Sequence, residues 1–477
     1  MEKLIDIVGG GLAGSEAALQ LAARGIRVRL IEMRPEVQTP VHTGGGLSEL
    51  VCSNSLKSMK TDSAAGMLKT ELAMMGSKVF AAAQQCSVPA GGALAVDRDR
   101  FSACVTGAIE AHALIEIVRA EAVGIAATGK VLVRPANQGD IIELPGTPRA
   151  IILASGPLTS DALAESLQDL TGMEHLAFYD AAAPIVMTDS LDFDKLFTQS
   201  RYEDEGTGDY LNAPFTKDEY DLFIEALLSA ERVIAKDFET KDLFQACQPI
   251  EEIARKGHDA PRFGTLKPVG LTDPVTGKRP WAALQLRAEN ASKTSYNLVG
   301  FQTNLTFPEQ RRVFGMIPGL EKAEFARYGV MHRNTFIDAP HVLDSSLQLI
   351  GKPVDRLPVP VFVAGQLGGT EGYCEAIASG LFVSLAVYAQ LEEKELPLLP
   401  DTTAFGALLA YVRDATVKDY QPLHVNFGIM VPLDPPVKKK RDRYAAYAQR
   451  GSDDLVSYCD RLRLVGILVD EESSYEK

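Results

Sequence analysis

Two cysteines of this 477-residue chain, Cys52 and Cys247, stand in surroundings suited to nucleophilic chemistry. Each precedes a segment whose pattern predicts the start of a helix. The polar residues 53–55 are suited to cap a helix running from about 56 to 75, and Pro249 suits a first helical position. Unpaired N–H groups and the macrodipole at a helix N-terminus favour thiolate over thiol. Because thiolate is the nucleophilic form, the sequence predicts two reactive cysteines.

A packing role is the competing interpretation, because free cysteine is often a small buried hydrophobic residue. Cys104 and Cys459 fit that role, since each shares a helical stripe with apolar residues, whereas Cys86 and Cys374 are ambiguous. Six cysteines in so long a chain are not a disulfide framework, and none forms a Cys-x-x-Cys pair. We therefore expect free thiols in a cytoplasmic protein, with no metal site.

The chain opens with the pattern of a dinucleotide-binding unit. An apolar strand at 4–8 leads into six residues with glycines at the first, third and sixth positions, Gly9-Gly10-Gly11-Leu12-Ala13-Gly14. A helix at 15–24 and a strand at 26–31 follow, and Glu32 ends that strand. The glycines allow a tight turn against a pyrophosphate, the helix N-terminus attracts its charge, and the acid accepts ribose hydroxyls. The sequence therefore predicts a bound dinucleotide.

A second strand–glycine–helix unit lies near the C-terminus. An apolar strand at 359–366 ends in Gly365 and Gln366, a glycine-rich turn reaches Gly372, and an apolar helix covers 374–388. In many FAD proteins such a unit closes over the ribityl chain and the flavin. Because a second G-x-G-x-x-G in context is missing, we expect FAD as the tightly held cofactor. A nicotinamide reductant, NAD(P)H, would then visit without a domain of its own.

The pattern between these units changes twice. Residues from about 113 to 153 alternate as strands do and end in a buried strand. Residues 181–324 are richer in aromatic and charged side chains, with a helix at 216–235 and strands at 281–286 and 296–301. We therefore expect a discontinuous first domain, 1–180 with 325–477, and an inserted α+β domain, 181–324.

Charge limits the partners. The formal net charge of −15 argues against a generic nucleic-acid binder. Local exceptions exist: residues 437–450 carry six Lys or Arg against one acid, with Tyr444 and Tyr447 among them. A solvated helix and a phosphate-binding surface both fit that segment. No apolar run reaches the roughly 18 residues of a membrane span, and the N-terminus shows no signal peptide.

Long runs along nearly the whole chain closely resemble one family, the bacterial folate- and FAD-dependent tRNA (uracil-5-)-methyltransferases. The resemblance is carried in order by 9–14, Glu32-Met33-Arg34-Pro35, 49–56, 87–98, 179–186, 267–271, 276–280, 327–335 and Val425-Asn426-Phe427-Gly428. Two departures stand apart from the two cysteines. The segment at 120–148 is longer than is usual in the family, and 368–370 lie where its flavin loop varies.

The resemblance implies an α/β fold with a Rossmann-like FAD-binding domain of the glutathione-reductase or GidA-like type. It implies transfer of a methylene group from 5,10-methylenetetrahydrofolate to C5 of a tRNA T-loop uridine, uridine 54. Reduced FAD would supply the electrons, and NADPH or NADH would reduce the FAD. By the same resemblance Cys247, in the inserted domain, is the nucleophile at C6 and Cys52 the base at C5. The residues alone do not order those roles.

Further candidates serve the folate and the RNA. An imidazole, a guanidinium and an amide stand together at His332, Arg333 and Asn334, where they would clamp the flat pterin or simply make structural hydrogen bonds. Folate-tail and tRNA phosphate charges need cations, and the candidates are Lys267, Lys278, Arg279 and the 437–450 cluster. Arg98 and Arg100 begin a helix, where they would contact FAD phosphates or pair with acids.

Four other functions remain open from the sequence. The first is the same chemistry on a ribosomal uridine. The second is the related wobble-uridine-modifying flavoprotein, which works with a GTPase and is longer. The third is a small-molecule flavin oxidoreductase that needs neither RNA nor both cysteines. The fourth is a flavin-dependent RNA chaperone without catalysis, in which Cys247 could be replaced without loss of function.

Overall fold

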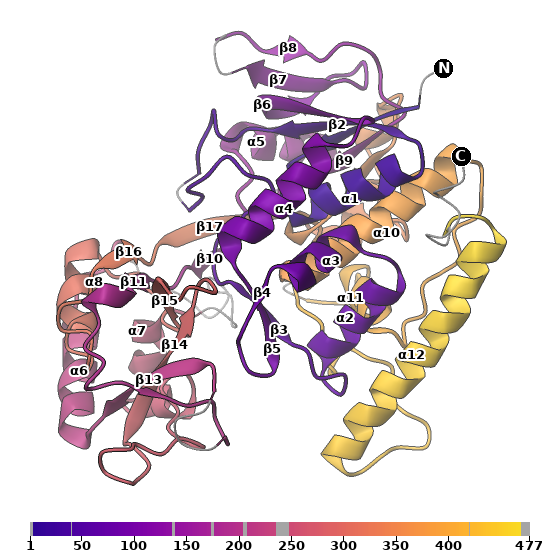
Figure 1. The fold of residues 1–477 in the computed structure, drawn as a ribbon. Coiled ribbons are helices and arrows are strands. Elements are labelled where there is room, and N and C mark those ends of the chain that lie inside the picture. The colour runs from indigo at the N-terminus through magenta and orange to yellow at the C-terminus, as the bar shows by residue number, and fades with distance from the viewer. Residues whose placement is uncertain are drawn as a thin grey trace.

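A seven-stranded sheet forms the framework of the computed structural model, in the order β18-β9-β1-β2-β6-β7-β8 (Figure 1). Its first five strands run parallel: β18 (Val361–Val363), β9 (Ala150–Leu153), β1 (Leu4–Val8), β2 (Arg27–Glu32) and β6 (Ile115–Ile125). The second half of β6 pairs antiparallel with β7 (Val131–Pro135), which pairs with β8 (Ile142–Glu143). The β pattern expected from 113 to 153 is confirmed where the chain is described. The structure describes residues 3–39, 41–135, 139–172, 176–203, 208–234, 248–418 and 420–468.

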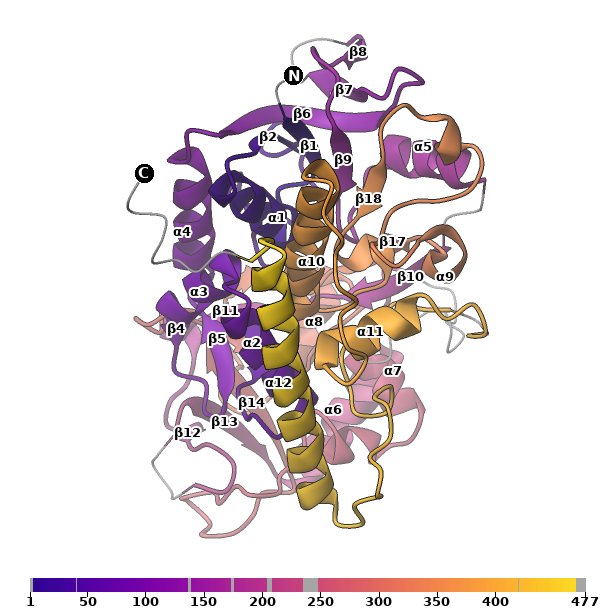
Figure 2. The ribbon, with the colours of Figure 1, turned by 90° about the vertical axis from the view of Figure 1, so that its right-hand side faces the viewer.

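Two helices pack against each other beside the parallel strands, α1 (Leu12–Ala23) and α10 (Tyr373–Leu391) (Figures 1 and 2). Gly380 makes their close approach possible, because a Cβ there would lie 2.2 Å from the carbonyl oxygen of Ala13. By length and composition α10 is apolar enough to cross a membrane, but 78% of its most apolar 18-residue stretch is buried inside the protein. A core helix has the same composition, so this finding does not indicate a membrane span.

The remaining elements of this half cover the sheet and its ends. The helices are α2 (Ala64–Met74), α3 (Lys78–Gln85), α4 (Arg98–Glu110), α5 (Asp161–Thr171), α9 (Ala339–Val342), α11 (Ala404–Val412) and α12 (Lys440–Leu464). A small antiparallel sheet has the order β3-β5-β4, formed by β3 (Ser55–Ser58), β5 (Ala93–Val96) and β4 (Ser87–Val88).

The helix expected from about 56 to 75 is wrong in its first third. Residues 55–58 form β3, and α2 begins only at Ala64, where the Ser63 side chain accepts the N–H of Gly66 (3.1 Å). The polar residues expected to cap the helix have other partners. The Asn54 amide donates to Val96 O (3.1 Å) and Ala288 O (3.0 Å), far along the chain. Cys52 therefore does not lie at a helix N-terminus, and the dipole argument for its activation fails.

A second sheet of six strands has the order β12-β13-β14-β15-β11-β16 (Figure 1). Its strands are β12 (Phe197–Thr198), β13 (Tyr210–Phe215), β14 (Ala282–Ala288), β15 (Ser295–Leu298), β11 (Ile185–Met187) and β16 (Phe325–Arg327). The helices α6 (Lys217–Ser229), α7 (Ile250–Arg255) and α8 (Phe307–Phe314) belong to the same half. The expected strands at 281–286 and 296–301 correspond to β14 and β15, of which β15 ends three residues early. The expected helix at 216–235 corresponds to α6, but α6 ends at Ser229 and residues 230–234 are not helical.

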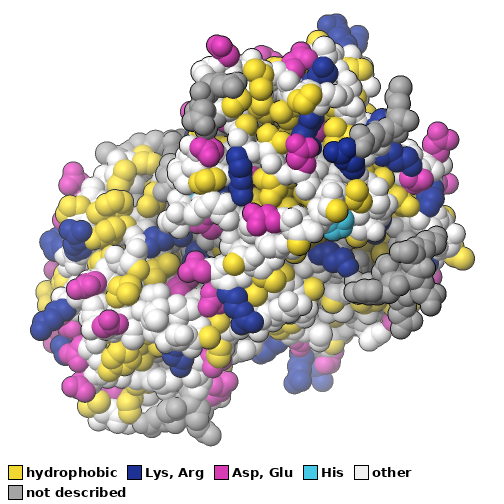
Figure 3. Space-filling view, turned by 45° about the horizontal axis from the view of Figure 1, so that its top comes forward, with side chains coloured by type: hydrophobic (Ala, Val, Ile, Leu, Met, Phe, Trp, Pro, Cys, Tyr) yellow, Lys and Arg dark blue, Asp and Glu magenta, His cyan; other side chains and the backbone are white. Residues whose placement is uncertain are grey.

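The two halves have separate hydrophobic clusters. One cluster spans Ile5 to Leu167 and resumes at Phe336, and the other spans Val186 to Leu320. An antiparallel pair, β10 (Leu176–Ala181) with β17 (Met331–Phe336), connects them (Figure 1). The domain boundaries at 180/181 and 324/325 stay a prediction. On the face drawn in Figure 3, acidic and basic side chains are interspersed over both halves.

Candidate active site

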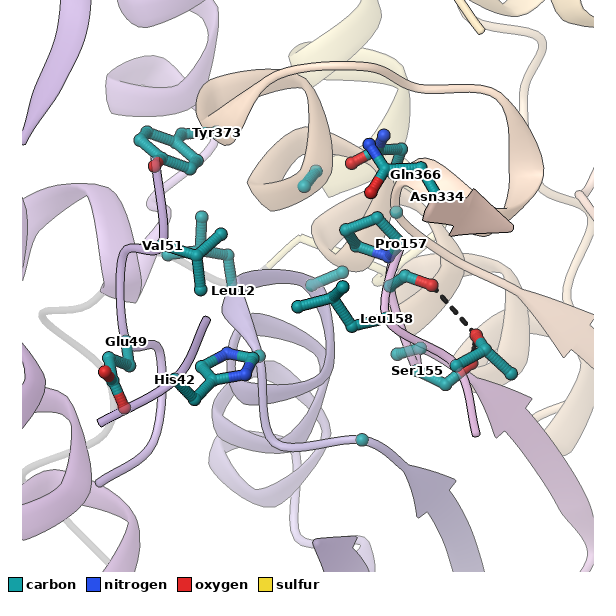
Figure 4. Close-up of a pocket in the computed structure, with 18 of the residues that line it drawn as sticks. Leu12, His42, Glu49, Val51, Ser155, Pro157, Leu158, Asn334, Gln366 and Tyr373 are labelled. Atoms are coloured by element: carbon teal, nitrogen blue, oxygen red, sulfur yellow. Dashed lines mark hydrogen bonds between the residues drawn. The ribbon is translucent and has the colours of Figure 1, made fainter. Parts of the chain in front are cut away.

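A cavity of about 380 Å³ opens where the parallel strands end (Figure 4). Its lining includes Val8 at the end of β1, Glu32 at the end of β2, Ala154 just after β9 and Gly365 just after β18. Ligands of open α/β sheets bind at this edge. The cavity continues from there to Cys52, so it joins the predicted dinucleotide site to one of the two predicted thiols.

The glycine loop is shaped by close backbone contacts. Gly9 has φ +102°, and a Cβ there would lie 2.4 Å from the carbonyl oxygen of Ala154. A Cβ on Gly14 would lie 1.9 Å from the carbonyl oxygen of Gly9. Gly11, which caps α1, would meet nothing within 4 Å, so its open side is available to a ligand. Of the predicted loop residues, Gly9, Gly11, Leu12 and Ala13 line the cavity, whereas Gly10 and Gly14 shape the turn.

Glu32 holds this loop and faces the cavity. Its Oε2 accepts the N–H of Gly10 (2.8 Å), and its Oε1 accepts the N–H (3.0 Å) and Nε (2.9 Å) of Arg34. Arg34 Nη1 also reaches Glu49 Oε2 (3.0 Å). Burial, and then the Arg34 charge, lower the pKa of His42 to about 4, so this cavity-lining ring is neutral at pH 7. Lone pairs of a carboxylate remain for a ribose hydroxyl, because each oxygen can accept more than one hydrogen bond.

The opposite wall contains buried polar atoms without partners among the described residues. They are Gln366 Nε2, Asn334 Oδ1 and Glu371 Oε2, and all three residues line the cavity. Figure 4 shows the Gln366 and Asn334 amides side by side. Burial, and then the neighbouring Asp180, raise the pKa of Glu371 well above its usual value, which favours the uncharged carboxyl. Buried donors and acceptors that lack partners need a polar ligand. The edge of a flavin ring, which carries both donors and acceptors, fits this wall.

The turn beside that wall needs glycine at two predicted positions. Gly365 has φ +80° and Gly372 has φ +117°, and both line the cavity. Gly372 caps α10, and a Cβ there would lie 2.3 Å from Glu375 Oε2. The N-termini of α1 and α10 therefore both face the ligand space, as the two glycine patterns predict.

Cys52 lies at the far end of the cavity with its sulfur between two polar groups. Its Sγ is 3.8 Å from the carbonyl oxygen of Ala181, and Gln302 Nε2 lies 4.0 Å from the sulfur. The hydroxyl of Tyr373, in the first turn of α10, accepts the N–H groups of Cys52 (3.0 Å) and Ser53 (3.1 Å). The loop that carries the thiol is thus tied directly to the helix at the cavity wall.

Two guanidinium groups hold the same loop. Arg98 donates to Leu50 O (2.6 Å) and Cys52 O (3.2 Å) and pairs with Glu289 (2.5 Å). Arg327 donates to Val51 O (2.8 Å). Of the two roles expected for Arg98, the structure shows pairing with an acid. Three consecutive backbone carbonyls, those of residues 50–52, are therefore held by cations from both halves of the molecule.

The other cysteines differ from Cys52. Cys374 also lines the cavity, but its Sγ lies 3.9 Å from Leu56 O, and burial raises its pKa to about 12. Cys86 and Cys459 are buried in the larger hydrophobic cluster, against which Cys104 packs. Cys247 lies outside the described residues. A helix does begin shortly after it, one residue later than expected: Pro249 caps α7, which begins at Ile250.

The six residues predicted to bind folate or RNA do not lie together, and three of them belong to one strand, β17. His332, Arg333 and Asn334 form part of β17, so their side chains alternate between the two faces of the strand. His332 and Asn334 line the cavity, whereas Arg333 is exposed. Lys267, Lys278 and Arg279 lie in loops of the other half, outside the cavity lining. The structure thus does not bring the six residues together.

Sequence reasoning missed several residues that build the site. They are Arg34, His42, Glu49, Lys57, Gln302, Glu371 and Tyr373, all of which line the cavity. Their roles depend on partners far away in the chain, which no local pattern records. The runs 32–35 and 49–56 were the available signal, because they contain two of the seven, Arg34 and Glu49.

Comparison with known proteins agrees with this architecture. A family model described as "Glucose inhibited division protein A" matches residues 4–395. The solved structure of Aquifex aeolicus GidA superimposes with a TM-score of 0.67 at 16% identity, covering 100% of this chain and 75% of that chain. At this identity the likeness shows the fold, a Rossmann-like FAD-binding fold, as the sequence predicted.

Closer relatives are found by sequence. A protein of Geobacter sulfurreducens named methylenetetrahydrofolate--tRNA-(uracil-5-)-methyltransferase TrmFO is 50% identical over 455 residues, covering 95% of this chain and 98% of its own. A protein of the same name from Listeria monocytogenes is 46% identical over 462 residues, covering 97% and 100%. Identity at this level over nearly the full length of both chains settles the relationship. The chain belongs to the TrmFO family of methylenetetrahydrofolate--tRNA-(uracil-5-)-methyltransferases.

Proposed function

We propose that this chain methylates C5 of uridine 54 in the tRNA T-loop, with 5,10-methylenetetrahydrofolate as carbon donor and reduced FAD as reductant. Family membership gives the coarser statement, folate-dependent methylation of a tRNA uracil at C5 by a flavoprotein. One observation supports the more specific proposal: a single cavity extends from the glycine loop that would hold the dinucleotide to Cys52. In this proposal the protein is cytoplasmic.

The residues on the cavity wall fit FAD. Gly9, Gly11 and Glu32 would hold its pyrophosphate and ribose, at the N-terminus of α1. The unpartnered amides of Gln366 and Asn334 and the carboxyl of Glu371 would bind the polar edge of its ring. Bound FAD would supply the two electrons that convert a transferred methylene group into a methyl group, after reduction by NADPH or NADH.

The chemistry needs one thiolate and one base. In the proposal Cys247 adds to C6 of the uracil, which creates an enolate that is nucleophilic at C5. C5 then bonds to the one-carbon unit. Cys52 accepts the proton that leaves C5, so the bond between the transferred carbon and its carrier nitrogen can break, with the electron pair leaving on that nitrogen. Reduced FAD would supply hydride to the resulting exocyclic methylene, and the enolate formed would expel the Cys247 sulfur and restore the ring double bond. Each cysteine thus has a different partner atom on the same base.

A hydrogen-bonded connection supports a shared site for the two thiols. Ile250, three residues after Cys247 in the sequence, donates its N–H to the carbonyl of Gln302 (2.8 Å). The side chain of the same glutamine lies 4.0 Å from the Cys52 sulfur. Glu251, in the first turn of that helix, accepts the N–H of Asn304 (2.6 Å) and the Thr303 hydroxyl (3.1 Å). The start of α7 is therefore hydrogen-bonded to the loop segment 302–304, whose Gln302 side chain lies beside Cys52.

The remaining predicted residues keep proposed roles. His332 and Asn334 are proposed to contact folate, and their place in the cavity lining supports this role. Arg333, Lys267, Lys278 and Arg279 are proposed to meet the folate tail or RNA phosphates outside it. In the proposal the FAD-binding domain is 1–180 with 325–477, and the insert 181–324 contributes Cys247.

Trapping with 5-fluorouridine-substituted tRNA tests the mechanism. In 5-fluorouridine a fluorine replaces the hydrogen at C5, and a base cannot remove it. The thiolate added at C6 therefore cannot be expelled and stays bonded to the RNA. We expect a covalent adduct, mapped by mass spectrometry to Cys247, in the protein supplied with folate and NADPH. The Cys247→Ala variant should give none. An adduct on another residue, or no adduct with turnover intact, contradicts the assigned roles.

Substrate choice is tested by transcripts. Methylation of a tRNA transcript should disappear when uridine 54 is replaced by cytidine and should be absent on ribosomal RNA fragments. Methylation of a ribosomal or wobble uridine would redirect the proposal to those targets. NADPH oxidation that continues at full rate without RNA or folate, and does not need Cys52, would indicate a small-molecule oxidoreductase instead.

A further inference from the structure

We propose that the first half of α12 with the residues before it, 438–450, binds the sugar–phosphate backbone of the tRNA. We call this segment the basic arm. The identity of the RNA rests on the proposed function, whereas the arm itself is inferred from charge, ring contacts and its connection to the active site. None of its residues lines the cavity.

The basic arm concentrates positive charge on an acidic protein. It contains six cations against one acid, Asp442, in a chain with formal net charge −15: Lys438, Lys439, Lys440, Arg441, Arg443 and Arg450. None of the six forms an ion pair with a carboxylate in the described part of the chain, whereas surface cations elsewhere, such as Lys195 and Lys217, do. Repulsion among unpaired like charges on one short segment is relieved by an anionic partner.

Aromatic rings hold several of these cations in place. Tyr444 and Tyr447 stack on Phe427, with ring centroids 4.1 and 5.4 Å apart. Lys440 Nζ and the Arg443 guanidinium lie 5.4 and 5.8 Å from the Tyr444 centroid. A cation over a ring keeps its charge and its outward N–H groups. The rings therefore order the cations without neutralising them, as a backbone-binding surface requires.

The same stack connects the arm to the active site. Phe427 belongs to the segment 425–428, and the N–H of Val425 donates to Glu375 Oε1 (3.2 Å). Glu375 lies in the first turn of α10 and lines the cavity. RNA held by the arm would consequently be held at a fixed orientation to the cavity.

The second half of α12 anchors the helix. Leu455, Tyr458 and Leu462 are fully buried. A Cβ on Gly451 would lie 1.9 Å from the Met67 side chain of α2, so the two helices meet closely there. The N-terminal end of α12, in contrast, projects beyond its neighbours (Figures 1 and 2). Residues 440–450 span about 15 Å at 1.5 Å per residue, enough to follow several phosphates.

An RNA backbone explains the arm better than a membrane surface. A helix lying on a bilayer needs an exposed apolar face opposite its cations. Here the faces of Tyr444 and Tyr447 pack on Phe427, and Tyr447 is buried. The apolar side of the arm is thus already covered, and what it exposes is charge.

Binding of tRNA at several salt concentrations tests the inference. The variant Lys439→Gln/Lys440→Gln/Arg441→Gln is compared with Lys130→Gln/Lys195→Gln/Lys217→Gln, which removes three cations paired with Glu143, Glu321 and Asp221. Both variants lose the same charge. Affinity for unmodified tRNA transcript is measured by fluorescence anisotropy from 50 to 300 mM KCl. We expect the arm variant to bind at least about tenfold more weakly at low salt, with a salt slope smaller by about two to three.

The control variant should retain the affinity and slope of the parent. In methylation assays the arm variant should raise KM for tRNA and leave kcat within about twofold. Equal tRNA binding by the two variants, or no binding by the parent, overturns the inference. Arm-dependent binding to phosphatidylcholine–phosphatidylglycerol vesicles (3:1), with tRNA affinity unchanged, overturns it in favour of a membrane.

The outcomes separate this inference from the proposed function. Arm-dependent tRNA binding without methylation supports the inference and contradicts the proposed function. Methylation of uridine 54 by the parent, together with unchanged tRNA affinity in the arm variant, supports the proposed function and contradicts the inference. Melting temperatures of the variants, which change exposed side chains, should match that of the parent.

Discussion

At the scale of single residues, the sulfur of Cys52 differs from that of Cys374 in its access to the ligand space. Both residues line the cavity. Cys374 is buried, and its raised pKa of about 12 keeps it a neutral thiol at any pH at which the protein works. Cys52 is partly exposed and lies beside the side chain of Gln302. One cavity thus contains a thiol suited to packing and a thiol suited to proton transfer.

Replacing each of these cysteines with alanine should separate the two roles. Cys52→Ala should lower kcat for tRNA methylation by about 10²- to 10⁴-fold, the range of a lost general base. Its FAD content, read from absorbance near 450 nm, should stay unchanged. Cys374→Ala should keep most of the activity and lose about 1 kcal/mol of stability. If Cys52→Ala methylates tRNA at the parent rate, Cys52 is not the base.

The candidate site was only partly predictable at this scale. Gly9, Gly11 and Glu32 were identified because a strand, a turn and a helix that are contiguous in sequence form their environment. Cys52 was singled out as preceding a helix that in fact begins only at Ala64, so the residue was found and its physical reason was wrong. Tyr373 and Gln302 could not be found from local pattern, because their partners lie hundreds of residues away.

At the scale of elements, the crossing of α1 and α10 places two helix N-termini at one cavity. At this crossing Gly380 lies against the carbonyl of Ala13, where a Cβ would come within 2.2 Å. Ala13 belongs to the glycine loop and lines the cavity, so a shift of α10 would move that loop. The helix packing and the cofactor wall are therefore one structural unit.

Gly380→Val should separate these helices. The Cβ would meet backbone at 2.2 Å, so we expect a loss of about 3 kcal/mol in stability and release of FAD. Gly107→Ala in α4 is the matched control, because nothing lies within 4 Å of its Cβ position. It should gain up to about 1 kcal/mol. Thermal unfolding measures the stability of both variants, and the ratio of flavin to protein absorbance measures their FAD content. Normal FAD content in Gly380→Val would contradict the idea that the helix packing and the cofactor wall are one structural unit.

A buried carboxylate at the start of α11 should make stability depend on pH. Glu71 accepts the N–H groups of Ala404 (2.6 Å) and Phe405 (3.0 Å), and burial raises its pKa from 4.5 to about 7. Between these pH values the folded state binds more protons than the unfolded state, so stability falls as pH rises. Relative to Glu71→Gln, the parent should lose about 3 kcal/mol between pH 4.5 and 8. Urea unfolding of both proteins at several pH values measures this loss. A difference in the free energy of unfolding that stays constant with pH would contradict the prediction.

Elements with local signals were predicted well, and one with a remote partner was not. The strands and helices of both glycine units lie within a few residues of their expected bounds, because apolar period and glycine position determine them. Residues 55–58 became β3 because β5, about 40 residues later, supplies its pairing edge. Local polar residues at 53–55 resemble a helix cap equally well, so the sequence pattern alone could not distinguish the two.

At the scale of the whole molecule, the two halves meet at the loop that carries Cys52. Arg287, in β14, donates from Nε to Asn54 Oδ1 (2.7 Å) and from Nη2 to Ser53 Oγ (2.7 Å). Both Asn54 and Arg287 are buried. The Asn54 amide donates to Val96 O on one side and Ala288 O on the other. Contacts from both hydrophobic clusters thus determine where the thiol lies.

Asn54→Ala should weaken this junction. It removes three hydrogen bonds and leaves two carbonyls and part of a buried guanidinium unsatisfied, so we expect a loss of about 2 to 4 kcal/mol. Asn290→Ala, which removes hydrogen bonds to Thr294 in a surface turn, should cost about 1 kcal/mol or less. Urea unfolding measures both. Equal costs would show that the junction contributes nothing beyond an ordinary turn.

The Asn54–Arg287 contact also limits which chimaeras of this chain should fold correctly. Asn54 lies in the half built on the seven-stranded sheet and Arg287 in the half built on the six-stranded sheet, 233 positions apart in the chain. A chimaera that takes the insert from a distant relative inherits the guanidinium from one parent and the amide from the other. Only parents that share both can exchange this segment and keep the thiol where the cavity ends.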